Sequence, residues 1–328
     1  MQWVRPCLGL LIASGMAFAA DPALLQLVPP DAGAIAGLQV DQGKKSPLGQ
    51  YVLGHLGQSD AGIAKFVAES GFDPRRDVSE IVFALNALPP GANSVPGAHG
   101  LVVARGTFNP GRIESAVIAH GGSVTNFQGI DILSGAAKNG MGALAFLDTT
   151  TAALGDIEAI QQAITRRASG AAAGSWSSQA QTLSQDNDFW FLTNGPISGL
   201  TSVMPNGQAG PGMQNAQMFQ SVTGASGGLK FGANVVFTAD AVTRSDKDAQ
   251  ALADVLRFLS GMLQTNKSTN PTAAQLSALL SSLVLTTNAN VLHLSLTVPE
   301  AQLEGFLTAA HQHQATALSP HSGKPVVN

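Results

Sequence analysis

Short apolar runs alternate along this chain with segments in which apolar side chains recur every three or four positions. The runs 34–40 and 81–85 have the length and composition of β-strands. Between them, Ser46-Pro47 and Asp60 each precede a stripe of helical spacing, and Gly71 stands where the second stripe stops. The pattern therefore predicts two helices between these two strands.

Further along the chain, one order of elements occurs twice. The stretch 100–168 predicts a strand, a helix that begins at Asn109-Pro110, short strands and a final helix after Asp156. The stretch 229–311 predicts a strand at 229–238, a helix that begins at Ser245, two strands and a helix from Pro299. One interpretation is a duplicated β-α-β-β-α unit. The other is that this order is simply common in α+β proteins.

The predicted fold class is α+β, with antiparallel sheets faced by helices. An Ala/Gly/Ser-rich stretch at 169–178 predicts a flexible link between two halves. The Pro- and Gly-rich stretch 194–213 predicts a long surface loop. The resulting division has four parts: a signal peptide at 1–20, an N-terminal α+β half at 21–170, a C-terminal α+β half at 171–310 and a flexible tail at 311–328.

The first twenty residues have the three-part pattern of a secretory signal peptide. Arg5 precedes a short apolar segment, Leu8 to Phe18, and Ala17-Phe18-Ala19 forms a small-x-small cleavage pattern. The alternative, an uncleaved anchor, needs about 20 apolar residues to cross a bilayer, and this segment is shorter. We therefore expect cleavage near Ala19 and export to the periplasm or beyond. Because Cys7 lies in the leader, the mature chain would contain no cysteine and no disulfide.

Composition excludes several classes of function. Residues in the hydrophobic set make up 45% of the chain and charged residues 12%, a combination opposite to that of disordered proteins. The net charge is −4 and basic residues are not clustered, so we expect no nucleic-acid partner. No phosphate-binding glycine fingerprint follows a predicted strand, and we expect no cofactor. No stretch after residue 20 has the length and apolar content of a transmembrane helix.

One motif points to catalysis. Gly224-Ala225-Ser226-Gly227-Gly228 matches G-x-S-x-G, the turn that exposes the nucleophilic serine of many hydrolases. That turn requires a strand before the serine and a helix after it. Here a helix-like segment, 214–219, precedes the motif and a strand follows. We therefore interpret the motif as a glycine-rich turn and name no catalytic residue.

The sequence gives only weak evidence for metal ligands. His311 and His313 are two positions apart in the predicted tail, a spacing that places them on different faces of a helix. His293 is expected to point outward from a strand, and His120 to end a helix. Asp186-Asn187-Asp188 begins like a calcium loop but lacks the later glycine and glutamate. We predict no metal site.

Several phrases resemble a group of uncharacterised exported proteins of acidobacterial type. They are Val28-Pro29-Pro30-Asp31, Ser46-Pro47-Leu48-Gly49, Gly71-Phe72-Asp73-Pro74-Arg75-Arg76-Asp77, Gly100-Leu101-Val102-Val103-Ala104-Arg105-Gly106 and Ala145-Phe146-Leu147-Asp148. The resemblance extends over most of 23–310. It implies a shared α+β architecture and an exported location, and it implies no activity.

Three hypotheses of function follow. The first is a non-catalytic exported protein with a binding or envelope-associated role, which predicts an exposed apolar patch. The second is a carrier of an apolar or lipid ligand, which predicts a continuous apolar cavity. The third is a serine hydrolase using Ser226, which requires a histidine and an acid within hydrogen-bonding reach of the hydroxyl.

Overall fold

The structure is a computed structural model that describes residues 19–55, 61–85, 100–135, 142–193, 195, 221–265 and 277–305. Within these ranges no helix combines the length and the apolar content needed to cross a membrane. The predicted loop 194–213, apart from Gly195, and the predicted tail 311–328 lie outside the described residues.

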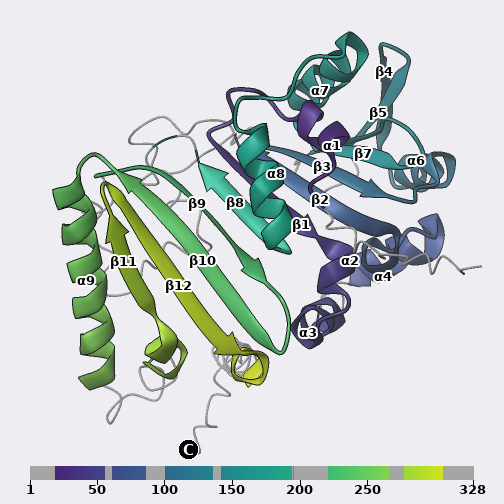
Figure 1. Ribbon diagram of the computed structural model, residues 1–328. Coiled ribbons are helices and arrows are strands. Elements are labelled where there is room, and N and C mark those ends of the chain that lie inside the picture. The colour runs from purple at the N-terminus through teal and green to yellow at the C-terminus, as the bar shows by residue number, and fades with distance from the viewer. Residues whose placement is uncertain are drawn as a thin grey trace, which may run out of the picture.

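The fold is α+β, and its centre is one twelve-stranded antiparallel sheet (Figure 1). The strand order is β11-β12-β10-β9-β8-β1-β2-β3-β7-β6-β5-β4, so both predicted halves contribute to the same sheet. The division at residue 170 and the internal duplication stay predictions. The strands are β1 (Ala34–Gln39), β2 (Val78–Leu85), β3 (Gly100–Gly106), β4 (Ser123–Phe127), β5 (Ile130–Ser134), β6 (Ala143–Phe146), β7 (Thr151–Gly155), β8 (Phe189–Thr193), β9 (Val222–Lys230), β10 (Asn234–Thr243), β11 (Val284–Asn288) and β12 (Val291–Pro299).

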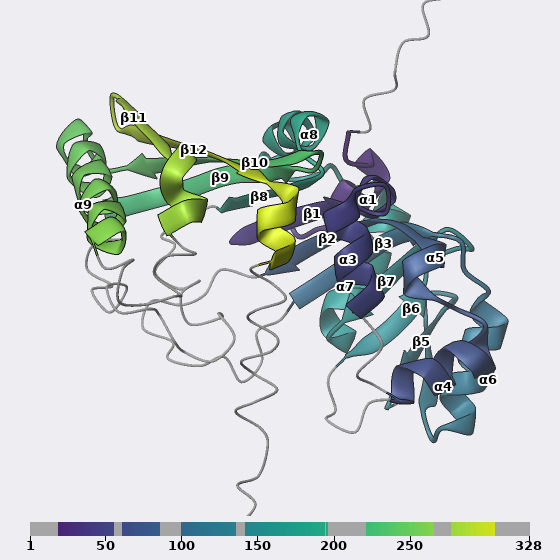
Figure 2. The same ribbon diagram turned by 90° about the horizontal axis from the view of Figure 1, so that it is seen from below.

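Helices lie on both faces of the sheet and around its ends (Figures 1 and 2). A further helical segment, at residues 300–305, follows β12. The helices are α1 (Pro22–Leu27), α2 (Val40–Gly43), α3 (Pro47–His55), α4 (Ala61–Ser70), α5 (Pro74–Asp77), α6 (Pro110–Ala119), α7 (Ile157–Ser169), α8 (Ser177–Asp186) and α9 (Asp246–Thr265), with a 3₁₀ turn at Leu280–Ser282.

The main core lies on the side of the sheet to which Trp190 points, which we call the Trp190 face. There α1, α7 and α8 pack over β1, β2, β3, β7 and β8 and bury one continuous apolar cluster. The indole of Trp190 is fully buried and lies across Gly37, its cross-strand neighbour on β1. A Cβ atom on Gly37 would come within 2.3 Å of the ring, so this position has room only for glycine.

The opposite side, which we call the Phe83 face, is covered by helices at its two ends. At one end α6 buries Ile113 and Val117 against Leu133 of β5. At the other end α9 buries Leu252 and Ala253 against β10 and β12. Figure 2 shows α8 on one side of the strands and α9 at the edge of the sheet near β11. Between α6 and α9 lies the central part of the Phe83 face, formed by β8, β1, β2, β3 and β7.

The local signals in the sequence explain several helix boundaries. Gly71 follows α4 with φ +70, a left-handed conformation in which glycine is favoured. The Asn109 side chain accepts a hydrogen bond from the Arg112 backbone N–H, 3.2 Å away, at the start of α6. Before α9, Ser245 Oγ accepts a hydrogen bond from the Asp248 N–H, as an N-cap side chain does, and donates to the Asp248 carboxylate. These three predicted boundaries are confirmed.

Two expectations are wrong. The predicted strand 229–238 is a hairpin, because the chain turns at 231–233 between β9 and β10. The predicted link 169–178 is not a free linker. Gly170 is the left-handed cap of α7, Trp176 is buried in the main core, and α8 begins at Ser177. The small residues of 169–178 predicted flexibility, but the buried side chain of Trp176 anchors this stretch to the main core.

Candidate functional site

The structure places Ser226 inside strand β9, which corrects the predicted glycine-rich turn. Its direct cross-strand neighbours are Leu192 on β8 and Asp240 on β10. Asp240 in turn neighbours His293 on β12, and His293 Nδ1 lies 2.6 Å from Asp240 Oδ1. The order across the sheet is therefore serine, acid, histidine. A nucleophilic serine needs the imidazole next to its hydroxyl, so this row lacks the geometry of a catalytic triad.

The glycines of the motif have a packing role. A Cβ atom on Gly227 would lie 2.2 Å from the Thr238 carbonyl oxygen of β10. One on Gly228 would lie 2.3 Å from Cγ of Asn187, which precedes β8. Glycine at both positions allows the neighbouring strand and turn to approach β9 closely. The match to a hydrolase motif is therefore explained by the sheet itself.

The other candidate ligands are separated in space or bonded to the protein. His293 is half exposed, as predicted, and pairs with Asp240. His120 caps the end of α6 and pairs with Glu69 of α4. Asp188 is buried, where it accepts hydrogen bonds from Lys230 Nζ at 2.9 Å and from the Phe231 N–H at 2.7 Å. The described residues contain no group of three metal-ligating side chains, and His311 and His313 lie outside them.

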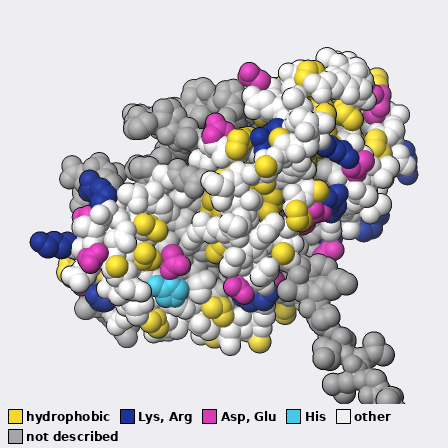
Figure 3. All heavy atoms as spheres, turned by 45° about the horizontal axis from the view of Figure 1, so that its top comes forward, with side chains coloured by type: hydrophobic (Ala, Val, Ile, Leu, Met, Phe, Trp, Pro, Cys, Tyr) yellow, Lys and Arg dark blue, Asp and Glu magenta, His cyan; other side chains and the backbone are white. Residues whose placement is uncertain are grey.

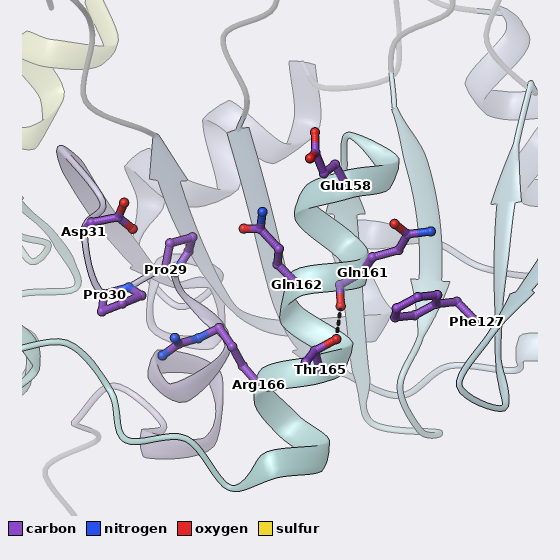
Figure 4. Close-up of a pocket in the computed structure, with 9 residues that line it drawn as sticks. All are labelled: Pro29, Pro30, Asp31, Phe127, Glu158, Gln161, Gln162, Thr165 and Arg166. Atoms are coloured by element: carbon purple, nitrogen blue, oxygen red, sulfur yellow. Dashed lines mark hydrogen bonds between the residues drawn. The ribbon is translucent and has the colours of Figure 1, made fainter.

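A pocket of about 450 Å³ lies beside α7 (Figure 4). The Arg166 side chain is held by hydrogen bonds within the protein. Its Nε donates to the Gln26 carbonyl at 3.1 Å, and its Nη2 donates to the Ala172 carbonyl at 3.0 Å. Thr165 Oγ1 donates to the Gln161 carbonyl at 2.9 Å. The described lining combines two carboxylates, two amides, a hydroxyl and a guanidinium with an aromatic ring, and it contains no serine, cysteine or histidine. It consists of Pro29, Pro30, Asp31, Phe127, Glu158, Gln161, Gln162, Thr165 and Arg166.

Four polar side chains form a row across the Trp190 face, where the main core ends. Gln39, Glu80, Arg105 and Thr151 are direct cross-strand neighbours on β1, β2, β3 and β7. Arg105 Nη1 donates to Thr151 Oγ1 at 2.6 Å, and its Nε donates to the carboxylate of Asp21 at 2.8 Å. We call Gln39, Glu80, Arg105 and Thr151 the polar row. Sequence reasoning missed it, because nothing in the spacing brings four separate strands into register.

Glu80 is the unusual member of the polar row. It is only 7% exposed, and its two carboxylate oxygens accept from the Asp21 backbone N–H at 3.2 and 3.4 Å. Burial raises the pKa of Glu80 to about 7, because the charged form loses its hydration; the hydrogen bond from Asp21 and the charge of Arg105 offset only part of this effect. At neutral pH a nearby positive charge would therefore shift Glu80 toward its ionised form.

Five apolar side chains cross the central part of the Phe83 face in register. Phe191, Ala36, Phe83, Val102 and Leu154 are direct neighbours on β8, β1, β2, β3 and β7. Phe83 is 40% exposed and Leu154 46%. We call these five residues the apolar row. Large apolar groups left accessible in one line across a sheet are a feature of binding surfaces.

Helix α9 carries apolar side chains on two sides. One side packs on the sheet through Ala249, Leu252, Ala253 and Leu256. The other consists of Ala251, Val255, Phe258 and Met262, whose spacing of four, three and four residues places them on one line of the helix surface. Phe258 is 66% exposed and Met262 46%. We call these four residues the outer stripe.

The surface charge is mixed. On the face shown in Figure 3, acidic and basic side chains are interspersed among uncharged ones. Near the outer stripe, Arg257 Nη1 pairs with Asp254 at 2.7 Å, and its Nη2 donates to the Leu285 carbonyl. Lys247 lies between Asp246 and Asp248 in the sequence.

The fold and these surfaces define an α+β protein built on one broad antiparallel sheet. Comparison with solved proteins finds a likeness to TP0453, in the structure described as its crystal form IV. The TM-score is 0.50 at 11% sequence identity, over 89% of this chain and 97% of that one. No protein-family profile and no curated protein sequence matches significantly. At this identity the likeness shows the fold alone.

Proposed function

We propose that this chain is an exported, non-catalytic binding protein, and that the outer stripe of α9 is the surface that docks on its partner. The leader-like pattern before Ala20 and the resemblance to exported proteins support export. The serine, acid, histidine order at Ser226 argues against hydrolysis by that residue. The observation that carries the proposal is Phe258, an aromatic side chain 66% exposed on a helix that already buries its other apolar side.

The partner we propose is a protein with an apolar groove. A helix that lays an apolar stripe into a groove is a recurrent mode of recognition. A helix that lies on an anionic membrane surface instead carries an excess of lysine and arginine on its polar side. Helix α9 has Lys247 and Arg257 against three aspartates, and Arg257 is already paired with Asp254. This balance favours a protein partner over a lipid surface.

Site-specific photocrosslinking tests this proposal. A photoreactive phenylalanine analogue at position 258 is expected to give one discrete crosslinked band in the intact host envelope. The matched control carries the analogue at Gln250, which is exposed on a different side of α9. If position 258 crosslinked only to phospholipid, the partner would be a membrane surface and the proposed protein partner would be wrong. Equal, diffuse labelling from both positions would contradict docking through the outer stripe.

The apolar row favours a second candidate function, the carrying of an apolar or lipid ligand. Five aligned apolar side chains on a sheet face could contact an acyl chain along its length. Native mass spectrometry of the exported chain, beside a denatured control, is expected to show extra mass that denaturation removes. The variant Phe83→Thr, which keeps a good strand-forming residue, should lose that mass. A ligand-free mass in the unaltered chain would exclude this function.

A further inference from the structure

The backbone at Ala20 and Asp21 is bound to the protein by polar contacts. Ala20 is fully buried, and its N–H donates to Ser184 Oγ of α8 at 2.7 Å. Ser184 Oγ in turn donates to the Gln181 carbonyl at 2.8 Å, so its lone pairs face Ala20. The next nitrogen, that of Asp21, donates to Glu80. We call Ser184 Oγ and the Glu80 carboxylate, with the backbone between them, the terminal niche.

The charges around this niche do not balance. Three ionisable groups meet there: Glu80 on β2, Asp21 before α1, and Arg105 on β3. Arg105 is bonded to Asp21 and to Thr151, which leaves Glu80 without a cation of its own. Gln39 on β1 faces Glu80 but carries no charge. With both carboxylates ionised, the niche is therefore one positive charge short.

We propose that cleavage after Ala19 supplies this charge: the new α-ammonium group of Ala20 binds in the terminal niche, between Ser184 and Glu80. The proposal rests on the proposed export, since export brings the chain to a signal peptidase. Cleavage hydrolyses the Ala19–Ala20 peptide bond with one water molecule, which leaves a carboxylate on the leader and an ammonium group on the mature chain. The mature N-terminus is then a structural element of the core.

The geometry agrees with this choice of bond. Consecutive backbone nitrogens are separated by less than about 4 Å, as consecutive Cα atoms are, so the Ala20 nitrogen lies within about 7 Å of the Glu80 carboxylate. At that distance, inside the protein, opposite charges attract appreciably. The small-x-small pattern Ala17-Phe18-Ala19 selects the same bond. Cleavage one residue later would remove Ala20, a fully buried residue of the main core.

This arrangement distinguishes the mature chain from its precursor. In the precursor a neutral amide occupies the niche, and burial raises the pKa of Glu80 to about 7, so the protonated and ionised forms are both populated near neutrality. In the mature chain the ammonium group favours the ionised form of Glu80. Removal of the leader would therefore make the folded mature chain more stable than the folded precursor at neutral pH.

The test compares two full mature chains, residues 20–328, that differ only in the chemical state of the α-amino group of Ala20. One has the free α-amine, released from a fusion by a protease that leaves no extra residue, and the other is α-acetylated. At pH 7.5 the free-amine chain is expected to melt about 2 °C higher. In Glu80→Gln, an isosteric neutral variant, this difference should disappear. An equal difference with and without Glu80 would overturn the pairing.

A chemical readout separates this role from general packing. Pairing with a carboxylate raises the pKa of an amine, and each unit lowers the fraction of reactive free base tenfold below that pKa. At pH 7 the α-amine of the mature chain should therefore be acylated about tenfold more slowly than that of Glu80→Gln or of a chain extended by two glycines before Ala20. Equal rates in the three chains would overturn the proposal. Because these chains are cut in vitro, the result stands whether or not the host exports the protein; N-terminal sequencing of exported protein tests export by itself.

Discussion

Replacing Trp190 with alanine is expected to lower the free energy of unfolding by about 3 to 5 kcal/mol, the usual cost of deleting a buried aromatic side chain. Trp190 is fully buried in the main core and lies between two glycines, Gly37 on β1 and Gly228 on β9. Neither glycine has a side chain that could fill the cavity. Urea unfolding followed by circular dichroism measures the change.

The conservative variant Trp190→Phe is the control for this prediction. The buried indole Nε1 of Trp190 has no hydrogen-bond partner among the described residues. Phenylalanine removes this unpaired donor while it keeps most of the apolar ring, so the variant should lose less than half as much stability as Trp190→Ala. If the two variants lost the same amount, or if Trp190→Ala lost less than about 1 kcal/mol, the packing of the main core described here would be wrong.

A second large effect concerns pH. In a chain with a peptide bond before Ala20, Glu80 is expected to cost about 3 kcal/mol of stability between pH 4.5 and pH 7. The pKa of Glu80 rises from 4.5 to about 7 on folding, so the native state binds a proton more tightly than the unfolded state. That contribution is fully present below pH 4.5 and is lost as pH rises through about 7. Glu80→Gln should show no such loss.

The difference between the two chains isolates Glu80, because the other shifted carboxylates titrate elsewhere. Asp148 has a pKa lowered to about 2 despite partial burial, since Thr150 and Arg167 bond to it. The pKa values of Asp73 and Asp77 are lowered by the side-chain hydrogen bonds of Arg75 and Arg76. Their contributions are lost only below this window. Urea unfolding at pH 4.5, 6, 7 and 8 gives the two curves; parallel curves would contradict a buried, ionisable Glu80.

Local chemistry explains why much of the fold was predictable from the sequence. Caps such as Asn109 and Ser245 act within one helical turn, so their residues predict a helix start wherever the rest of the chain goes. The hairpin between β9 and β10 was missed because apolar residues lie on both sides of its turn, Phe231-Gly232-Ala233, which contains only one turn-forming residue. Helix α8 was missed because one buried residue, Trp176, outweighs the composition around it.

The candidate sites were less predictable, because they depend on strand register. The neighbours of Glu80 in the polar row come from β1, β3 and β7, and no sequence spacing aligns them. The sequence predicted the helix that begins at Ser245 but did not mark the outer stripe of α9, because a helix with apolar residues on two sides does not reveal which side meets the sheet. Ser226 shows the converse, a motif whose residues serve strand packing.

The measurement that tests the central claim most directly is crosslinking from position 251 in three chains: the unaltered sequence, Phe258→Asp with Met262→Asp, and Lys247→Asp. Ala251 is an exposed member of the outer stripe that none of these variants changes, so a probe there reports a partner while the rest of the stripe is altered. We predict that the double variant loses at least nine-tenths of a crosslink to one protein while it keeps the unaltered melting temperature, and that Lys247→Asp keeps the crosslink. A crosslink that survives in the double variant would contradict binding through α9.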